Sequence, residues 1–223
     1  LVGSEMCIRD SLLPGHRQRQ VAQGRLPFRR LRRRALRSQA GPAAWLPRSR
    51  DCRDGFGRLY EVTGEQRYLD LAEYFVTERG RQPYIFDIQA DENAKRDADA
   101  NYKPNTDPSR YAYHQANKPV TEQDEAVGHA VRAGYFYSGL ADVARLADDQ
   151  DLADAAERLW RNIVDKKLYV TGGIGGTVDG EAFSYNYDLP NDSAYSETCA
   201  AISLAFFCLL YTSPSPRDKR QSR

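Results

Sequence analysis

The sequence has neither a long apolar run nor an excess of charge of either sign. Its 223 residues include 32 basic and 31 acidic side chains, which gives a formal net charge of +1. Composition therefore predicts neither nucleic acid nor an acidic membrane surface as a partner. No apolar run approaches the roughly 20 residues that a membrane-spanning helix requires. Residues 1–10 lack the basic and then apolar order of a signal peptide, which favours a cytoplasmic location.

Cysteine is scarce and scattered. The four cysteines lie far apart in the sequence, and none belongs to a C-x-x-C pair: Cys7, Cys52, Cys199 and Cys208. A chain of this length with so few cysteines is not expected to be held together by disulfides. The default interpretation of each one is a buried, unreactive thiol.

Acidic residues and lysine are absent from residues 12–50, where arginine recurs. One interpretation is a basic arm that binds nucleic acid. Basic arms normally contain lysine as well as arginine. A segment rich in arginine, proline, alanine and glycine but without lysine is typical of a GC-rich gene translated out of frame. We favour the second interpretation for residues 12–54. Residues 1–11 and 208–223 resemble translated sequencing adapters, so we expect residues 55–207 to form the folded domain.

Residues 55–207 show helical rather than strand periodicity, so we expect an all-α fold. A first helix is predicted after the capping-box pattern TGEQ at residues 63–66 and ends near Gly80. A second helix is predicted over residues 119–146 with Thr121 as its N-cap. A third begins at Asp148-Asp149, and a fourth begins near Ser193.

The predicted helices have apolar faces at helical spacing. These faces comprise Leu69, Ala72, Phe75 and Val76 in the first helix, Ala126, Ala130, Ala133, Tyr137 and Leu140 in the second, and Leu152, Ala155, Ala156, Leu159, Trp160 and Ile163 in the third. Polar loops are predicted at residues 91–110 and 171–192. Successive helices with longer loops between some of them predict an α/α toroid or a helical repeat.

Chemistry-bearing residues gather in the second half of the chain. The glycine-rich run at residues 171–176 lacks the Lys-Ser/Thr of a phosphate-binding loop, so we interpret it as a place where the backbone turns or approaches a neighbour closely. Glu197 and Cys199 have the donor atoms of two zinc ligands, although a closed zinc site needs four. The alternative is an acidic residue at a helix N-terminus and a buried thiol.

Two further residues are candidates for a sugar site. Glu181 lies near Phe183 and several tyrosines, where a carboxyl group can serve as a general acid, and the alternative is a solvated loop carboxylate. His129 is expected on the second helix, either as a ligand-binding group or as a hydrogen-bonded packing residue. Loops rich in acids and aromatic rings suit sugar binding.

Six segments, in this order and spacing, resemble glycoside hydrolase family 127: NKPVTEQ at residues 117–123, EAVGHAVRA at 125–133, YVTGGIG at 169–175, GEAF at 180–183, YDLPN at 187–191 and ETCA at 197–200. The resemblance covers about residues 55–207. It implies that these residues are part of the catalytic (α/α)6 barrel. It also implies release of terminal β-L-arabinofuranose, with retention of configuration, from arabinose-containing oligosaccharides.

The resemblance also assigns roles to individual residues. Glu181 matches the family's general acid/base, and His129 matches a sugar-binding histidine. Glu197 and Cys199 match two Zn²⁺ ligands, and Glu197 also matches a sugar contact. The family's nucleophile is a cysteine, itself a zinc ligand, in a Cys-Cys pair downstream of these motifs. Zinc would hold that thiol as a thiolate, which replaces the carboxylate nucleophile of other retaining glycosidases.

This sequence departs from the family pattern in two respects. Asn117 stands where we expect histidine, and the Cys-Cys pair is absent. Without the nucleophile and two of the zinc ligands, we expect the chain by itself to be inactive. A barrel that lacks helices at both ends would expose apolar faces, so we also expect the chain to be poorly soluble. Two alternative functions stay open. One is a non-catalytic sugar-binding or scaffold protein on the same toroid. The other is a different toroid enzyme, such as a sugar epimerase or an unsaturated-uronide hydrolase, which would be indifferent to zinc chelation.

Overall fold

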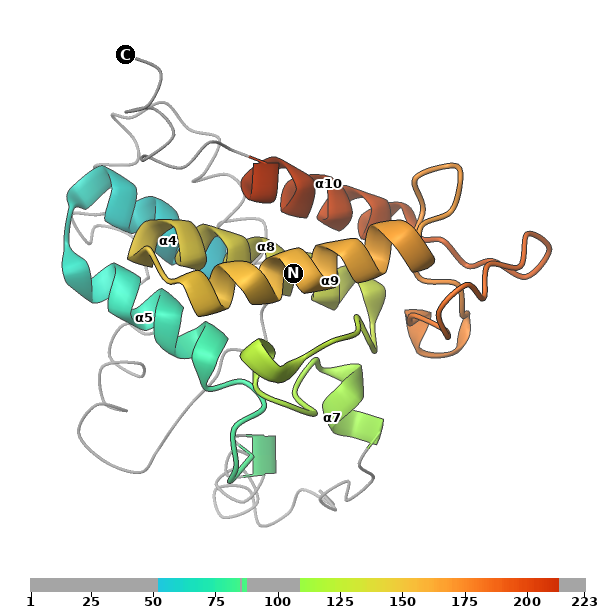
Figure 1. Cartoon of the computed structure of the whole chain (residues 1–223), viewed down its shortest axis with the longest axis horizontal. Coiled ribbons are helices and arrows are strands. Elements are labelled where there is room, and N and C mark those ends of the chain that lie inside the picture. The colour runs from blue at the N-terminus through green and yellow to red at the C-terminus, as the bar shows by residue number, and fades with distance from the viewer. Residues whose placement is uncertain (1–51, 85, 88–108, 213–223) are drawn as a thin grey trace, which may run out of the picture. The chain divides into compact units, whose positions relative to one another are not determined.

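A computed structural model describes residues 52–84, 86–87 and 109–212 (Figure 1). The predicted adapter-like segment 1–11, nearly all of the arginine-rich segment 12–54, most of the predicted loop 91–110 and the tail from residue 213 lie outside the described residues. The chain divides into two compact units. Unit 1 is Leu1–Tyr111 with Ala116–Pro119, and unit 2 is Ala112–Gln115 with Val120–Arg223.

The regular secondary structure of the described residues is helical; they contain no strand and only two isolated β-bridges. The all-α prediction is therefore confirmed for this part of the chain. The α-helices are α4 (Cys52–Thr63), α5 (Gln66–Thr77), α7 (Ser109–Tyr113), α8 (Ala130–Ala147), α9 (Gln150–Lys166) and α10 (Thr198–Thr212). Two 3₁₀ turns, η1 (Val120–Glu122) and η2 (Asp179–Glu181), lie in the connections.

In unit 1, α4 and α5 form an antiparallel helical pair (Figure 1). The predicted face of α5 is confirmed, because its buried residues are Leu69, Ala72, Phe75 and Val76. Phe56 of α4 stacks on Tyr68 with ring centroids 6.4 Å apart and contacts Phe75 at 5.8 Å. Aromatic contacts of this kind make the interface between the two helices specific as well as apolar.

The predicted capping box at the start of α5 is wrong. Thr63 is the last residue of α4, and its hydroxyl donates back to the Leu59 carbonyl at 2.6 Å. The N-cap of α5 is Glu65, whose side chain makes no capping hydrogen bond. The pattern was misread because sequence did not reveal α4, so a residue that ends one helix was assigned to the start of the next.

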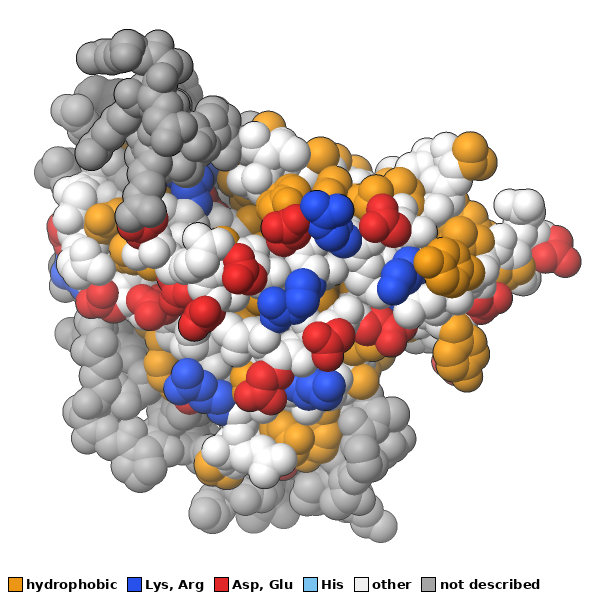
Figure 2. Space-filling model, viewed as in Figure 1, with side chains coloured by type: hydrophobic (Ala, Val, Ile, Leu, Met, Phe, Trp, Pro, Cys, Tyr) orange, Lys and Arg blue, Asp and Glu red, His pale blue; other side chains and the backbone are white. Residues whose placement is uncertain are grey.

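Unit 2 is built on α8, which packs against both α9 and α10. The core at this junction is aromatic: Phe207 of α10 is fully buried, with its ring 5.8 Å from Tyr137 of α8 and 5.3 Å from Trp160 of α9. On α9, Glu157 and Arg161 form an ion pair at 2.7 Å. Acidic and basic side chains are interspersed on the face of the molecule that Figure 2 shows. Among the described helices none is both long and apolar enough to cross a membrane.

The second predicted helix begins about ten residues later than expected. Residues 120–122 form the turn η1, and α8 itself starts at Ala130 with His129 as its N-cap. Side chains from elsewhere bind the intervening backbone: Asn162 accepts from the Ala126 N–H at 2.9 Å, and Gln115 donates to the Val127 carbonyl at 2.9 Å. Ala126 is buried as predicted, but it lies outside the helix.

The third predicted helix is confirmed and the fourth is shifted. Asp149 caps α9 by accepting from the Leu152 N–H at 3.1 Å, and five of the six predicted apolar positions are buried, with Trp160 partly exposed. The last helix, α10, begins at Thr198 rather than near Ser193. It continues without a break past Phe207 to Thr212, so the predicted boundary at residues 207–208 falls inside a helix.

Candidate functional site

The glycine-rich segment at residues 171–176 carries the backbone close to the start of α8. At Gly175 the φ angle is +82°, and a Cβ there would lie 2.7 Å from the Cβ of Ala130. Only glycine fits both the left-handed conformation and this close approach. The interpretation of this run as a turn with a close backbone contact is therefore confirmed.

Glu181 is positioned by the loop that follows. It is the last residue of η2, and its φ angle of 51° lies in the left-handed region that L-residues rarely adopt. The next residue, Ala182, forms β-bridges with Thr177 and with His129, and the Phe183 N–H donates to the Gly128 carbonyl at 2.9 Å. These pairings fix the loop beside the first turn of α8.

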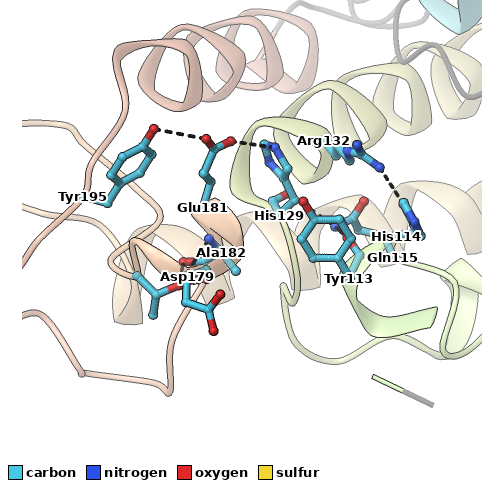
Figure 3. A network of polar contacts seen from close by, with 10 residues as sticks. Tyr113, His114, Gln115, His129, Arg132, Asp179, Glu181, Ala182 and Tyr195 are labelled. Carbon is cyan, nitrogen blue, oxygen red and sulfur yellow. Dashed lines mark hydrogen bonds and ion pairs between the residues drawn. The ribbon is translucent and has the colours of Figure 1, made fainter. Parts of the chain in front are cut away.

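The structure brings Glu181 and His129 into direct contact (Figure 3). The Nε2 atom of His129 lies 3.1 Å from Oε2 of Glu181. The histidine side chain is 5% exposed and the glutamate side chain 42% exposed, so the carboxylate faces solvent while its partner is buried. The His129 ring also makes an edge contact with Tyr113, with ring centroids 5.7 Å apart. Glu181 therefore has a buried side-chain partner although its own carboxylate is partly exposed.

The structure adds Tyr195, which sequence reasoning missed. Its hydroxyl donates to Oε1 of Glu181 at 3.1 Å, on the side of the carboxylate away from His129 (Figure 3). The pKa of Tyr195 is raised from its ordinary value of 10.0, first by this hydrogen bond and then by loss of hydration. The nearby Glu181 and Glu197 carboxylates and the Cys199 side chain raise it further through electrostatic interaction.

Glu197 and Cys199 lie at the start of α10. The Glu197 carbonyl accepts from the N–H groups of Ala200 and Ala201, so Glu197 precedes the first turn of the helix. Within the described residues its buried Oε2 atom has no hydrogen-bond partner. Cys199 is an exposed thiol that forms no disulfide. No group of three or more His, Cys, Asp or Glu residues gathers into a metal site in residues 52–84, 86–87 and 109–212.

Comparison with known proteins identifies the family. The family model of the β-L-arabinofuranosidase GH127 catalytic domain matches residues 28–212. The chain belongs to this family. The match extends beyond residues 55–207 at both ends and includes part of the arginine-rich segment, whose interpretation as out-of-frame sequence stays a prediction.

Individual relatives agree with this assignment. The chain is 47% identical over 154 residues to the non-reducing end β-L-arabinofuranosidase of Bifidobacterium longum subsp. longum, a match that covers 67% of this chain and 22% of the relative. A GH127 β-L-arabinofuranosidase from Geobacillus stearothermophilus T6 superposes with a TM-score of 0.65 at 42% identity, over 73% of this chain and 25% of that one. A second GH127 β-arabinofuranosidase superposes with a TM-score of 0.59 at 42% identity, over 76% of this chain and 23% of that one.

These relatives are much longer than this GH127 chain, which spans about a quarter of their length or less. Together with the helical secondary structure, the superpositions identify the described residues as part of an (α/α)6 barrel, as the sequence predicted.

Lys167 is a second site-forming residue of this GH127 chain that the sequence did not reveal. Its ammonium group donates to the Ser184 carbonyl at 2.7 Å and to Oε1 of Glu125 at 2.8 Å, and it lies 5.5 Å from the centroid of the Phe183 ring. The side chain is 3% exposed, and this burial lowers the pKa of Lys167. Lys167 therefore ties the loop that follows Glu181 to the end of α9.

An arginine–histidine pair borders the site from α8 (Figure 3). Nη1 of Arg132 lies 2.6 Å from Nδ1 of His114, and the guanidinium group lies 5.2 Å from the centroid of the Tyr113 ring. Arginine can only donate, so Nδ1 of His114 is the acceptor and the proton of the neutral ring is on Nε2. The pair was missed because His114 and Arg132 lie 18 residues apart and match no motif.

Proposed function

We propose that this GH127 chain is the acid/base-bearing part of a glycosidase that releases terminal β-L-arabinofuranose from arabinose-containing oligosaccharides. The observation that carries the proposal is the Glu181 carboxylate, which is open to solvent on one side and held at 3.1 Å by both His129 and Tyr195. The activities named for the relatives support the choice of sugar.

In this proposal Glu181 transfers protons at the glycosidic bond. Its protonated form donates a proton to the oxygen of the leaving group as the bond to the sugar breaks. The resulting carboxylate then takes a proton from the water molecule that releases the sugar from the nucleophile, which restores the acid. His129 and Glu197 bind sugar hydroxyl groups, as their family counterparts imply.

The residues at the start of α10 fit a zinc ion. Glu197 has a buried carboxylate oxygen without a hydrogen-bond partner among the described residues, and Cys199 has an exposed thiol two positions later. Carboxylate oxygen and thiolate sulfur are both ordinary zinc ligands. We propose that these two residues supply half of the zinc site. When bound, the metal would lower the pKa of a coordinated thiol and so make it a nucleophile at neutral pH.

The proposed reaction proceeds with retention on a cysteine nucleophile that this chain does not include. None of its four cysteines stands in a Cys-Cys pair. The chain on its own therefore has an acid/base but no nucleophile, and we propose that it is inactive alone. Release of arabinose by the purified 223-residue chain would refute this part of the proposal.

The test of the function uses the intact protein that carries this chain. We expect it to release arabinose from a β-L-arabinofuranosyl disaccharide, with the β anomer appearing first in a ¹H NMR time course. Glu181→Gln should reduce this rate by about 10²- to 10⁴-fold, the usual contribution of a general acid/base. Glu157→Gln, an exposed position on α9, serves as the control. An intact protein with no activity on the disaccharide would contradict the proposed function.

Chelation separates the proposal from its alternatives. Removal of zinc from the intact protein should abolish hydrolysis, and added zinc should restore it. A sugar epimerase or an unsaturated-uronide hydrolase on the same barrel would be indifferent to the chelator, and a scaffold protein would show no turnover before or after. Metal analysis of the purified protein gives an independent check, with one zinc per chain as the expected result.

A further inference from the structure

The backbone of Tyr195 is fixed relative to the start of α8. Its N–H donates to the Gly176 carbonyl at 3.1 Å, and the N–H of Ser196 donates to the Gly175 carbonyl at 3.0 Å. The glycine segment in turn packs against Ala130, the residue that follows His129. Tyr195 and His129 are therefore held on one framework, although 66 positions separate them in the sequence.

The two side chains contact opposite oxygens of one carboxylate. The Tyr195 hydroxyl donates to Oε1 of Glu181, and Nε2 of His129 lies beside Oε2, each at 3.1 Å (Figure 3). A carboxyl group with a single partner can rotate about the bond that links it to its side chain, because that torsion is soft. Two partners on separate elements remove this freedom and fix the plane of the group.

Packing does not account for Tyr195. The residue is 37% exposed, so its ring contributes less to the apolar core than a buried tyrosine would. Its hydroxyl nevertheless donates a hydrogen bond to Glu181, the residue that transfers protons in the proposed function. A phenylalanine at this position would preserve the ring and lose only the hydrogen bond.

We infer that Tyr195 is a positioning residue for the acid/base, an inference that rests on the proposed function. Its hydroxyl keeps Oε1 of Glu181 as a hydrogen-bond acceptor and holds the plane of the carboxyl group, so that the transferable proton points toward the leaving oxygen. Tyr195 does not touch the substrate in this scheme. It acts through Glu181, so its loss slows the reaction steps that need proton transfer more than the steps that do not.

The leaving group of the substrate provides the test. Departure of 4-nitrophenolate needs little help from an acid, whereas departure of a sugar alcohol needs a proton. The value of kcat/KM is measured for the intact enzyme on 4-nitrophenyl β-L-arabinofuranoside and on a β-L-arabinofuranosyl disaccharide. For Tyr195→Phe we expect a loss of about tenfold or more on the disaccharide, the usual effect of a lost hydrogen bond to a charged group. On the nitrophenyl glycoside we expect a loss smaller than twofold.

Two reference variants make the outcome decisive. Glu181→Gln should show the same selectivity for the leaving group in stronger form. Tyr185→Phe removes a hydroxyl from an 84% exposed tyrosine in the same unit and should change neither value. Equal losses on both substrates for Tyr195→Phe, or no loss on either, would overturn the inference while the proposed function stands. An unsubstituted enzyme that cleaves neither substrate would overturn the function and the inference with it.

Discussion

Gly128 directly precedes His129 of the candidate site and lies where the backbone closely approaches residues 112–113. Its φ angle is +74°, and a Cβ at this position would lie 2.2 Å from the Ala112 carbonyl oxygen and 2.6 Å from the Cα atom of Tyr113. Both contacts are with backbone, so no side chain can move aside. The Gly128 carbonyl also accepts from Phe183 in the loop after Glu181, and the next residue is His129.

The cost of Gly128→Ala has two parts. An L-residue in the left-handed region costs roughly 1–2 kcal/mol. The overlap with residues 112–113 must be relieved by a shift of the backbone, and local backbone strain of this kind costs about 1–3 kcal/mol. We therefore expect the free energy of unfolding to fall by about 2–5 kcal/mol.

Gly172→Ala is the matched control. Gly172 belongs to the same unit and has a φ angle of +84°, but a Cβ there would meet nothing within 4 Å. This variant should show only the left-handed cost, roughly 1–2 kcal/mol. The measurement is equilibrium unfolding of the 223-residue chain in urea, followed by far-ultraviolet circular dichroism, with midpoints and slopes compared. Equal destabilisation by the two substitutions would refute the argument from the close approach.

Two further predictions follow from side chains in unit 2. Burial lowers the pKa of Lys167 below its ordinary value of 10.5, so just below that pH the unfolded chain binds more protons and stability rises as the pH rises. Lys167→Met should remove this rise. Because the two proteins share their tyrosines, the difference between their free energies of unfolding isolates the contribution of Lys167. A difference that does not change with pH would contradict the assignment. On α10, Ile202, Phe206 and Leu209 form an apolar stripe that is 46%, 39% and 60% exposed. Ile202→Lys with Leu209→Lys should raise the soluble yield of the chain several-fold by reducing this exposed patch, whereas the control Leu204→Lys, at a buried position of the same helix, should lower it.

Apolar periodicity predicted the helices well wherever local rules decide the structure. The faces of α5 and α9 follow directly from the spacing of their apolar residues, and Asp149 has both the residue type and the position of an N-cap. The start of α8 could not be predicted in this way. Gln115 and Asn162, which are distant in the sequence, hydrogen-bond the backbone of residues 126–127, and these residues lie outside the helix despite their helical apolar spacing.

The candidate site was likewise only partly predictable from the sequence. Recognition of motifs selected Glu181, His129, Glu197 and Cys199 but gave no relation in space between them. Tyr195 stands two positions before Glu197, the first residue of the ETCA motif, so it lies close in sequence to the selected residues. Its partner, however, is 14 residues away along an irregular loop, and no periodic pattern predicts such a contact. Lys167 was overlooked because a lysine at the end of a helix is usually solvated.

Backbone strain explains why these loops resist prediction. Glu181, Tyr187 and Ser196 all have positive φ angles, of 51°, 66° and 41°, and all lie within the segment that carries the candidate site. Each such residue costs of order 1–3 kcal/mol and persists only where its surroundings determine its conformation. Here the surroundings are specific: Tyr187 N–H donates to the Lys166 carbonyl at 2.8 Å, and Ser196 N–H donates to Gly175. Residue preferences alone would place all three in other conformations, so the geometry around Glu181 follows from tertiary hydrogen bonds that a single sequence does not display.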